Sequence, residues 1–227
     1  MRSRHIKKWL LTRLAQEDIQ RALSEIMALK PEVVINPLFS LLLSTDPMVK
    51  WHTVTAFGLT VGRLAEKDME SARVIIRRLM WQLNDESGGI GWGCPEAMGE
   101  SLARHRGIGQ EYSKVLISYL AKDGNLLEHV PLQRGAIWAV GRLGESSPDL
   151  ARPSVPHLLP LLNSQDPNAR GLSAWALGLL GAKEALSTLY RLLHDQSFVE
   201  IYRDLKVQHV KVRDLALEAI QAMEKTF

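Results

Sequence analysis

One glycine-rich segment gathers several residue types that chemistry could use. It reads GGIGWGCPEAMGE from Gly88 to Glu100 and holds the single cysteine of the chain. A phosphate-binding loop would need a lysine followed by serine or threonine, and a strand before its first glycine. The segment has no lysine, and no strand is predicted before it. The pattern therefore excludes a phosphate-binding loop and, for want of the same strand, a dinucleotide-binding fingerprint.

Cys94 is the candidate nucleophile of this segment. A reactive cysteine needs a neighbouring base and a lowered thiol pKa. Cys94 opens a predicted helix, which favours the thiolate, but the repeat register derived below turns it toward a partner helix. We therefore expect a buried, unreactive thiol. One cysteine precludes an internal disulfide, and the seven histidines form no HExxH motif, so we expect no metal and no cofactor.

A short motif, Ala-x-Gly, recurs at intervals of roughly 40 residues, the length of some helical repeats. Before several copies lie an apolar stretch and a turn, as in PLFSLLLSTDPMVKW. Proline disfavours a helical residue before it and is well accepted in a first helical turn, so Asp-Pro predicts a break followed by a new helix. Each copy therefore predicts two helices joined by a turn. The copies end at Gly58, Gly99, Gly141, Gly178 and, in a degenerate fifth copy, Gln221.

This pattern resembles the HEAT repeat family over residues 31–227, and DPNARGLSAWALGLLG at 166–181 is similar to the HEAT-like repeat also found in phycobilin lyase subunits. The resemblance implies an all-α, right-handed α-solenoid of about five HEAT-like helix pairs. Residues 1–30 are expected to form an N-terminal helical cap, and 31–227 one continuous array with an insertion around 196–209. Most such arrays are scaffolds, so the resemblance also implies a protein or peptide partner.

The repeat register predicts which side of each second helix is buried. Counting from the final residue of the motif, with about 100° per residue, position −1 faces the first helix of its own repeat. The small residues at 0 and −2 face neighbouring repeats, and positions −7, −3 and +1 form a stripe on the concave side. The residues at −1 are Phe57, Met98, Val140, Leu177 and Ile220, which we expect to be buried.

The concave stripe carries four of the six tryptophans and several charges. Tryptophan is uncommon on a face meant only for water, and Trp and Arg are enriched at binding hot spots. We therefore predict a non-catalytic scaffold that binds a protein or peptide through a tryptophan-rich groove. In the alternative interpretation the rings cover the joints between repeats, and Glu100 pairs with Arg142. The predicted groove residues are Trp51, Trp92, Glu96, Glu100, Arg134, Trp138, Arg142 and Trp175.

An enzyme is the second hypothesis. Trp92-x-x-x-Glu96, with Arg134 and Trp138, is similar to the aromatic and carboxylate pair of HEAT-type alkylpurine DNA glycosylases, although those carry Asp. The resemblance implies that Glu96 would stabilise positive charge on the sugar while the rings hold a cationic base. Residues 31–227 hold 21 Lys/Arg against 22 Asp/Glu, which disfavours a DNA backbone as partner. Handling of a bound tetrapyrrole would rest on fold analogy alone.

Composition and charge complete the expectations. A hydrophobic content of 46% and a charged content of 23% are ordinary for a soluble protein, and no apolar run is long enough for a membrane span. We expect a cytoplasmic protein without membrane contact. Residues 1–30 hold seven Lys/Arg against three Asp/Glu. The basic helix expected in this segment is either a solvated cap with its apolar side packed inward or a contact for nucleic acid or a membrane surface.

Overall fold

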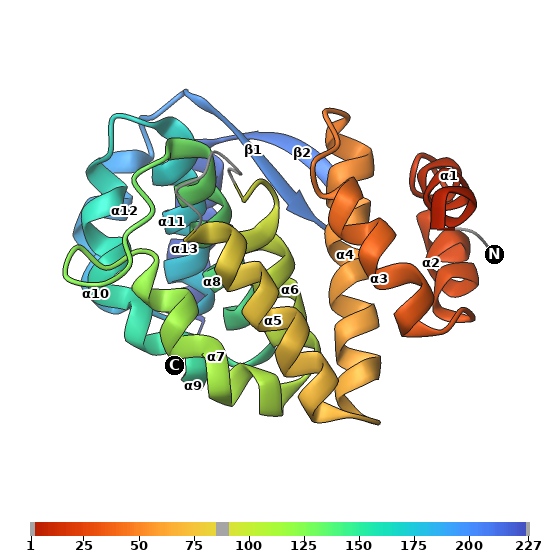
Figure 1. Ribbon diagram of the computed structural model, residues 1–227. Helices are drawn as coiled ribbons and strands as arrows, with labels where there is room; N and C mark the ends of the chain where they lie inside the picture. The colour runs from red at the N-terminus through yellow and green to blue at the C-terminus, as the bar shows by residue number, and fades with distance from the viewer. Residues whose placement is uncertain (1–2, 85–90, 226–227) are drawn as a thin grey trace. The chain divides into compact units, whose positions relative to one another are not determined.

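A computed structural model describes residues 3–84 and 91–225 of the chain (Figure 1). The first three residues of GGIGWGCPEAMGE lie outside this description. The described residues form two compact units. Unit 1 comprises residues 1–108 with 202–207, and unit 2 comprises 109–201 with 208–227.

The helices follow the predicted order. Helix pairs begin with α3 and end with α13, preceded by two further helices, so the expected all-α architecture of successive helix pairs is confirmed. The helices are α1 (Ser3–Leu14), α2 (Ile19–Met27), α3 (Pro31–Leu41), α4 (Pro47–Ala65), α5 (Met69–Leu83), α6 (Cys94–Arg104), α7 (Arg106–Ser118), α8 (Val130–Ser146), α9 (Pro148–Ala151), α10 (Val155–Leu158), α11 (Pro167–Leu179), α12 (Leu186–Leu192) and α13 (Val212–Glu224). Short 3₁₀ helices are η1 (Arg152–Ser154), η2 (Leu159–Asn163) and η3 (Lys183–Ala185).

The two Asp-Pro pairs begin second helices, as predicted. The carboxylate of Asp46 accepts hydrogen bonds from the backbone amides of Met48 and Val49 and so caps α4. Asp166 caps α11 in the same way. Each cap satisfies amides that have no partner inside the helix, and the following proline needs no such partner. These turns therefore set where α4 and α11 start.

The repeat glycines lie where neighbouring helices come close, which confirms the register. In unit 2 a Cβ at Gly178 of α11 would lie 2.7 Å from the Cα of Ala219 in α13. In unit 1 a Cβ at Gly58 of α4 would lie 2.9 Å from the backbone carbonyl carbon of Glu100 in α6. Such distances leave no room for a side chain without backbone movement. The residues at position −1, Phe57, Met98, Val140, Leu177 and Ile220, are all buried as expected.

The N-terminal helices α1 and α2 pack on the first helix pair of unit 1. The ring nitrogens of buried His52 in α4 lie 2.8 Å from the carbonyl oxygen of Leu14, which ends α1, and 3.3 Å from that of Leu205. The guanidinium of Arg63 donates to the backbone carbonyls of Met27 and Leu29 after α2. The predicted helical hairpin is therefore present, while the boundary at residue 30 between a cap and the array stays a prediction.

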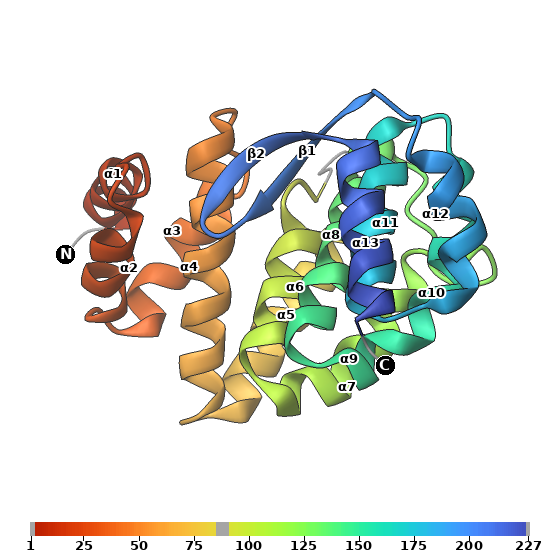
Figure 2. The same cartoon turned by 180° about the vertical axis from the view of Figure 1, so that it is seen from behind.

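The segment expected only as an insertion forms a β-hairpin. Strand β1 (Phe198–Arg203) pairs with β2 (Lys206–Lys211), and the turn between them places Asp204 and Leu205 in the left-handed region, at φ of 53° and 61°. The tip of this hairpin, residues 202–207, belongs to unit 1. There it lies beside α4 (Figure 2). This hairpin is the part of the fold that the helical repeat did not predict.

Candidate functional site

The first copy of the concave stripe is occupied by the hairpin tip. The ring of Tyr202 stacks on that of Trp51, with centroids 4.9 Å apart and planes 9° apart. The Tyr202 hydroxyl lies 2.8 Å from the Thr55 hydroxyl, one helical turn further along α4. Burial raises the pKa of Tyr202 to about 12. The stripe positions −7 and −3 of α4 therefore contact an extended segment of the chain itself.

The second copy combines an accessible aromatic residue with a buried carboxylate. Gly93 adopts a φ of 75°, which favours glycine, and directs the chain from Trp92 into α6. Trp92 keeps 39% of its surface exposed, whereas Glu96 keeps 3%. Lys50 donates to one oxygen of Glu96 at 2.7 Å, and its ammonium lies 5.0 Å from the centroid of the Trp51 ring. The other oxygen of Glu96 is buried without a hydrogen bond to any described residue.

Glu100 packs over Gly58 and pairs with Arg104 within unit 1. Its side chain is 2% exposed and covers the space over Gly58. Arg104, one helical turn later in α6, donates to it at 2.6 Å. The predicted pair of Glu100 with Arg142 joins residues of different units and stays a prediction. Within unit 2, Arg142 donates to Glu145 at 3.3 Å.

Arg134 holds the start of the next repeat in unit 2. Its guanidinium donates two hydrogen bonds to Asp166, at 2.7 and 2.8 Å, and Asp166 caps α11. Burial alone would raise the pKa of Asp166, but the hydrogen bonds from Arg134 and the helix amides outweigh it and hold that pKa below its usual value. A similar pair follows one repeat later, where Arg170 donates to Asp195 at 2.8 Å. These pairs link consecutive repeats.

The tryptophans of unit 2 are packing residues. Trp138 is 2% exposed. Trp175 lies over Gly141, where an added Cβ would come within 2.2 Å of its ring. A Cβ at Gly171, stripe position −7 of the fourth copy, would come within 2.5 Å of Val199 in β1. Strand β1 therefore covers the stripe here as well.

These observations correct one expectation about the groove. We expected Trp51, Trp92, Trp138 and Trp175 to offer open, flat contacts, but the rings of Trp51, Trp138 and Trp175 are buried. Their burial agrees with the alternative interpretation, in which rings cover the joints between repeats. Of the four, Trp92 offers an accessible ring. A binding role for the eight predicted groove residues stays a prediction.

Sequence reasoning missed two residues of the candidate site. Lys50 directly precedes the stripe, and Tyr202 lies outside the repeats, so the register assigned neither of them to the concave face. The alternation of Val199 and Ile201 with polar residues is a strand signal. It could have indicated that an extended segment was present, although not where its tip would pack.

Cys94 lies as expected, buried at the start of α6. Its side chain is 1% exposed, and its thiol donates to the Gln82 side chain at 3.0 Å. Burial, reinforced by the negative charge of Glu96, raises the pKa of the thiol to about 12. A thiol with such a pKa is not a nucleophile at neutral pH.

The described residues form neither a metal-binding cluster nor a membrane-spanning helix. Within residues 3–84 and 91–225, no group of three or more His, Cys, Asp or Glu side chains could hold a metal ion. No helix in this described portion is long and apolar enough to cross a membrane.

Comparison with protein families supports the repeat assignment. Residues 130–180 match the model of the HEAT-like repeat, and residues 169–195 match the model of the PBS lyase HEAT-like repeat. The chain carries HEAT-like repeats. The matched residues include α8 and α11, whose Gly141 and Gly178 end two of the recurring motifs. Five second helices, α4, α6, α8, α11 and α13, lie at the HEAT-like positions that the register predicted.

One relative and two solved structures are similar to this chain over most of its length. An uncharacterized protein of Archaeoglobus fulgidus is 25% identical over 199 residues, which cover 85% of this chain and 97% of that one. An engineered protein is 17% identical over 97% of both chains, with a TM-score of 0.53. A designed armadillo repeat protein solved in complex with the peptide (KR)4 is 16% identical over 95% of this chain and 98% of its own, with a TM-score of 0.51. At such identities the solved structures show the fold, an all-α repeat solenoid.

Proposed function

We propose that the chain is a non-catalytic scaffold that binds an extended segment of a partner protein on its concave stripe. The observation that supports this most strongly is the seating of the hairpin tip on α4. There an extended segment places Tyr202 on Trp51 and Thr55, so this face already accepts a strand through an aromatic stack and a hydroxyl contact. A peptide from another protein would use the same chemistry.

The accessible continuation of this face is the second copy of the stripe. Trp92 presents an exposed aromatic residue there, and Glu96, four residues later in the sequence, forms a largely buried ion pair with Lys50. Tryptophan is among the residues most enriched at binding hot spots. The peptide bound to the designed armadillo protein is a further support for a peptide as partner. The glycosylase hypothesis requires Glu96 to stabilise positive charge on a sugar. Its carboxylate instead pairs with the ammonium group of Lys50, so this contact does not favour that role. The hypothesis stays a prediction.

Selection from a phage-displayed peptide library tests this proposal. Peptides selected on the parent protein are measured against Trp92→Ala and, as the matched control, Trp81→Ala, since Trp81 is an even more exposed tryptophan on α5. We expect at least a tenfold loss of affinity for Trp92→Ala and little change for Trp81→Ala. Failure to enrich any peptide, or equal losses in both variants, would contradict the proposal.

Changing a charge separates binding from folding at the same face. Arg142→Glu and Glu96→Gln, of which the second keeps the size of the buried side chain, are compared with the parent in melting temperature and in affinity for the selected peptides. The proposal expects affinity to fall more than thermal stability. If both variants melt far below the parent while their peptide affinities stay intact, these two residues serve folding and not binding.

A further inference from the structure

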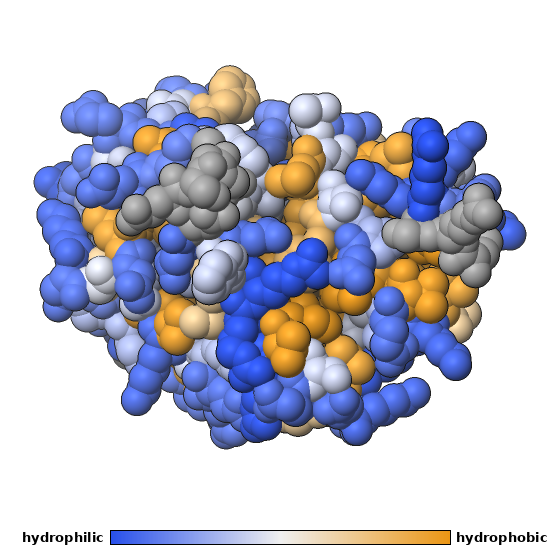
Figure 3. All heavy atoms as spheres, in the orientation of Figure 1, coloured by the Kyte–Doolittle hydropathy of each residue, from blue (hydrophilic) through white to orange (hydrophobic). Residues whose placement is uncertain are grey.

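The outward face of α1 carries three cations in a row. Arg4, Lys7, Lys8 and Leu11 follow the i, i+3, i+4, i+7 spacing that places residues on one side of a helix, and all four are exposed. Figure 3 shows strongly hydrophilic atoms projecting at the upper right, where α1 lies. We call Arg4, Lys7 and Lys8 the basic face of α1.

The opposite side of α1 is committed to the interior of unit 1. Ile6, Leu10 and Leu14 are fully buried, and the ring of His52 contacts the carbonyl oxygen of Leu14 at the end of the helix. The apolar side of α1 is therefore anchored in unit 1. This side cannot enter a bilayer, which is how an amphipathic helix gains most of its membrane affinity.

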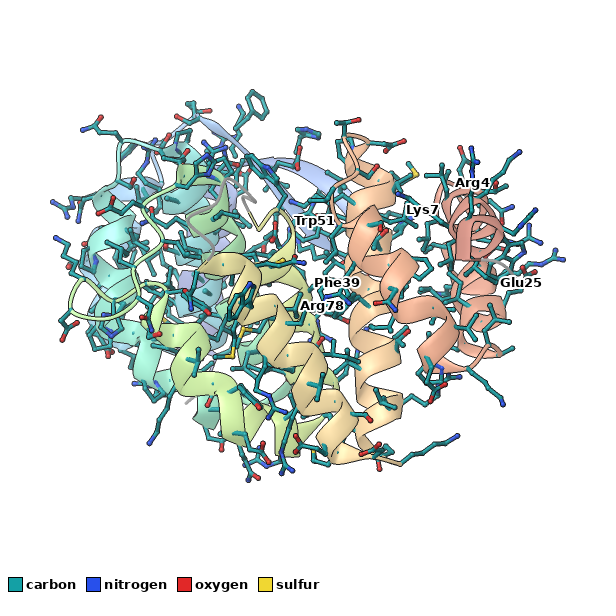
Figure 4. All side chains as sticks on the ribbon, in the orientation of Figure 1. Arg4, Lys7, Glu25, Phe39, Trp51 and Arg78 are labelled. Carbon is teal, nitrogen blue, oxygen red and sulfur yellow. The ribbon has the colours of Figure 1, made fainter. Side chains whose placement is uncertain are left out.

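The acidic residues near α1 are mostly engaged elsewhere. Glu25 of α2 pairs with Arg13 at 2.6 Å and with Arg21 at 3.3 Å. Asp18 accepts a hydrogen bond from a backbone amide of α2. Figure 4 shows Arg4 and Lys7 on α1 and Glu25 below them on α2. Within the described part of the chain, Arg4, Lys7 and Lys8 have no carboxylate partner.

We propose that the basic face of α1 binds the phosphate backbone of a nucleic acid. Helix α1 contains no acidic residue, so its outward side offers concentrated positive charge without internal neutralisation. An arginine fork and lysine ammonium groups are the usual donors to phosphate oxygens. The contact is electrostatic and independent of sequence, so the expected affinity is that of non-specific binding. This surface is separate from the concave stripe, and the two proposals can fail independently.

Fluorescence anisotropy with a labelled 20-base-pair DNA duplex tests the basic face. The test variant is Arg4→Gln/Lys7→Gln/Lys8→Gln. The control is Lys114→Gln/Lys122→Gln/Lys183→Gln, which removes the same charge from exposed positions of unit 2. Binding is measured between 25 and 200 mM NaCl, and circular dichroism with thermal melting checks that both variants fold. A double variant, Lys7→Gln/Lys8→Gln, provides an intermediate step.

The proposal expects the parent and the control to bind the duplex with similar affinity. The triple variant of α1 should lose at least tenfold at 50 mM NaCl, and the double variant less. The slope of log affinity against log salt should fall by about 2 to 3, because each lost phosphate contact removes about 0.9. Absence of duplex binding by the parent, or equal losses in the control, overturns the proposal.

Two further probes distinguish a nucleic acid from a membrane surface and from an acidic protein. Vesicles of phosphatidylserine and phosphatidylcholine measure membrane binding, and a polyglutamate peptide represents an acidic protein. Tighter binding of either probe than of the duplex, weakened by the α1 variant, would assign the basic face to that partner instead and overturn the nucleic-acid assignment.

Discussion

Tyr202 of the hairpin tip lies flat on Trp51 of α4, with ring centroids 4.9 Å apart and its hydroxyl 2.8 Å from Thr55. A contact between residues 151 positions apart in the sequence therefore completes the surface of the first repeat. This contact should also stabilise unit 1, and the change in unfolding free energy on single substitutions measures by how much.

Removing the hydroxyl or the ring of Tyr202 should destabilise unit 1 by different amounts. Tyr202→Phe loses the bond to Thr55 and should cost about 0.5–1.5 kcal/mol of unfolding free energy. Tyr202→Ala also loses the stack and the buried area, and should cost about 3 kcal/mol or more. Urea unfolding measures both. Tyr190→Phe is the control, because the Tyr190 hydroxyl bonds Glu224 at an exposed site. Equal stability of Tyr202→Phe and the parent would contradict the contact.

Alanine should be tolerated at one helical glycine and not at another. At Gly178 a Cβ would meet the backbone of Ala219 at 2.7 Å, whereas at Gly144 it would meet only the end of the Leu180 side chain at 3.2 Å. Both changes raise helix propensity by about 1 kcal/mol. We expect Gly144→Ala to be neutral or stabilising and Gly178→Ala to be destabilised by about 1–3 kcal/mol. The melting temperatures of the two variants and the parent measure these effects. A lower melting temperature for Gly144→Ala than for Gly178→Ala would contradict the close packing of α11 on α13.

The ion pair of Arg134 with Asp166 should make the free energy of unfolding depend on pH. The pKa of Asp166 is lowered in the folded state, so its contribution is present above the unfolded value near 3.8 and is lost as pH falls through the lower folded value. Arg134→Met should therefore destabilise most at pH 6–7 and least near pH 2. Urea midpoints across this range measure the difference from the parent.

The control for this pH profile is Arg191→Met. The Arg191 side chain donates to Thr188 and Asn163, which do not titrate. Its destabilisation should therefore stay constant with pH. A constant effect for Arg134→Met as well would show that its ion pair with Asp166 does not contribute.

Cys94 should react with a thiol reagent only when the protein unfolds. The thiol is buried, and a pKa of about 12 leaves on the order of 1 in 10⁴ molecules as thiolate at pH 8. Ellman's reagent should label native protein over hours and protein in 6 M guanidinium within seconds to minutes. Equally rapid labelling in both conditions would show that α6 opens at its N-terminus.

The sequence register predicted the helical packing because its determinants are local. A glycine column marks the approach of neighbouring helices, as at Gly58 and Gly178, and a large apolar residue at −1 marks the side facing the first helix. Both properties follow from 3.6 residues per turn and from side-chain size. The apolar residue recurs in all five copies and the glycine in four, so the register could be read without knowing any tertiary contact.

The candidate site was harder to predict because its exposure depends on distant segments. The position of Trp51 on the concave side follows from the register, but its burial follows from Tyr202. The Asp204-Leu205 turn lacks the Asn-Gly or Asp-Gly pair that usually marks a tight hairpin, so no local signal announced it. Charge partners such as Lys50 for Glu96 also depend on the spacing between repeats, which single positions do not encode.

The hairpin tip has a consequence for synthesis on the ribosome. Residues 1–108 of unit 1 emerge first, but residues 202–207, which cover Trp51 and Thr55, follow only after about 100 more residues. At roughly 5–20 residues per second this delay lasts about 5 to 20 s. During that interval the nascent first repeat exposes an aromatic and hydroxyl surface that the finished protein hides. A chain arrested before residue 202 would keep this surface open, and it is there that a chaperone would find an early binding site.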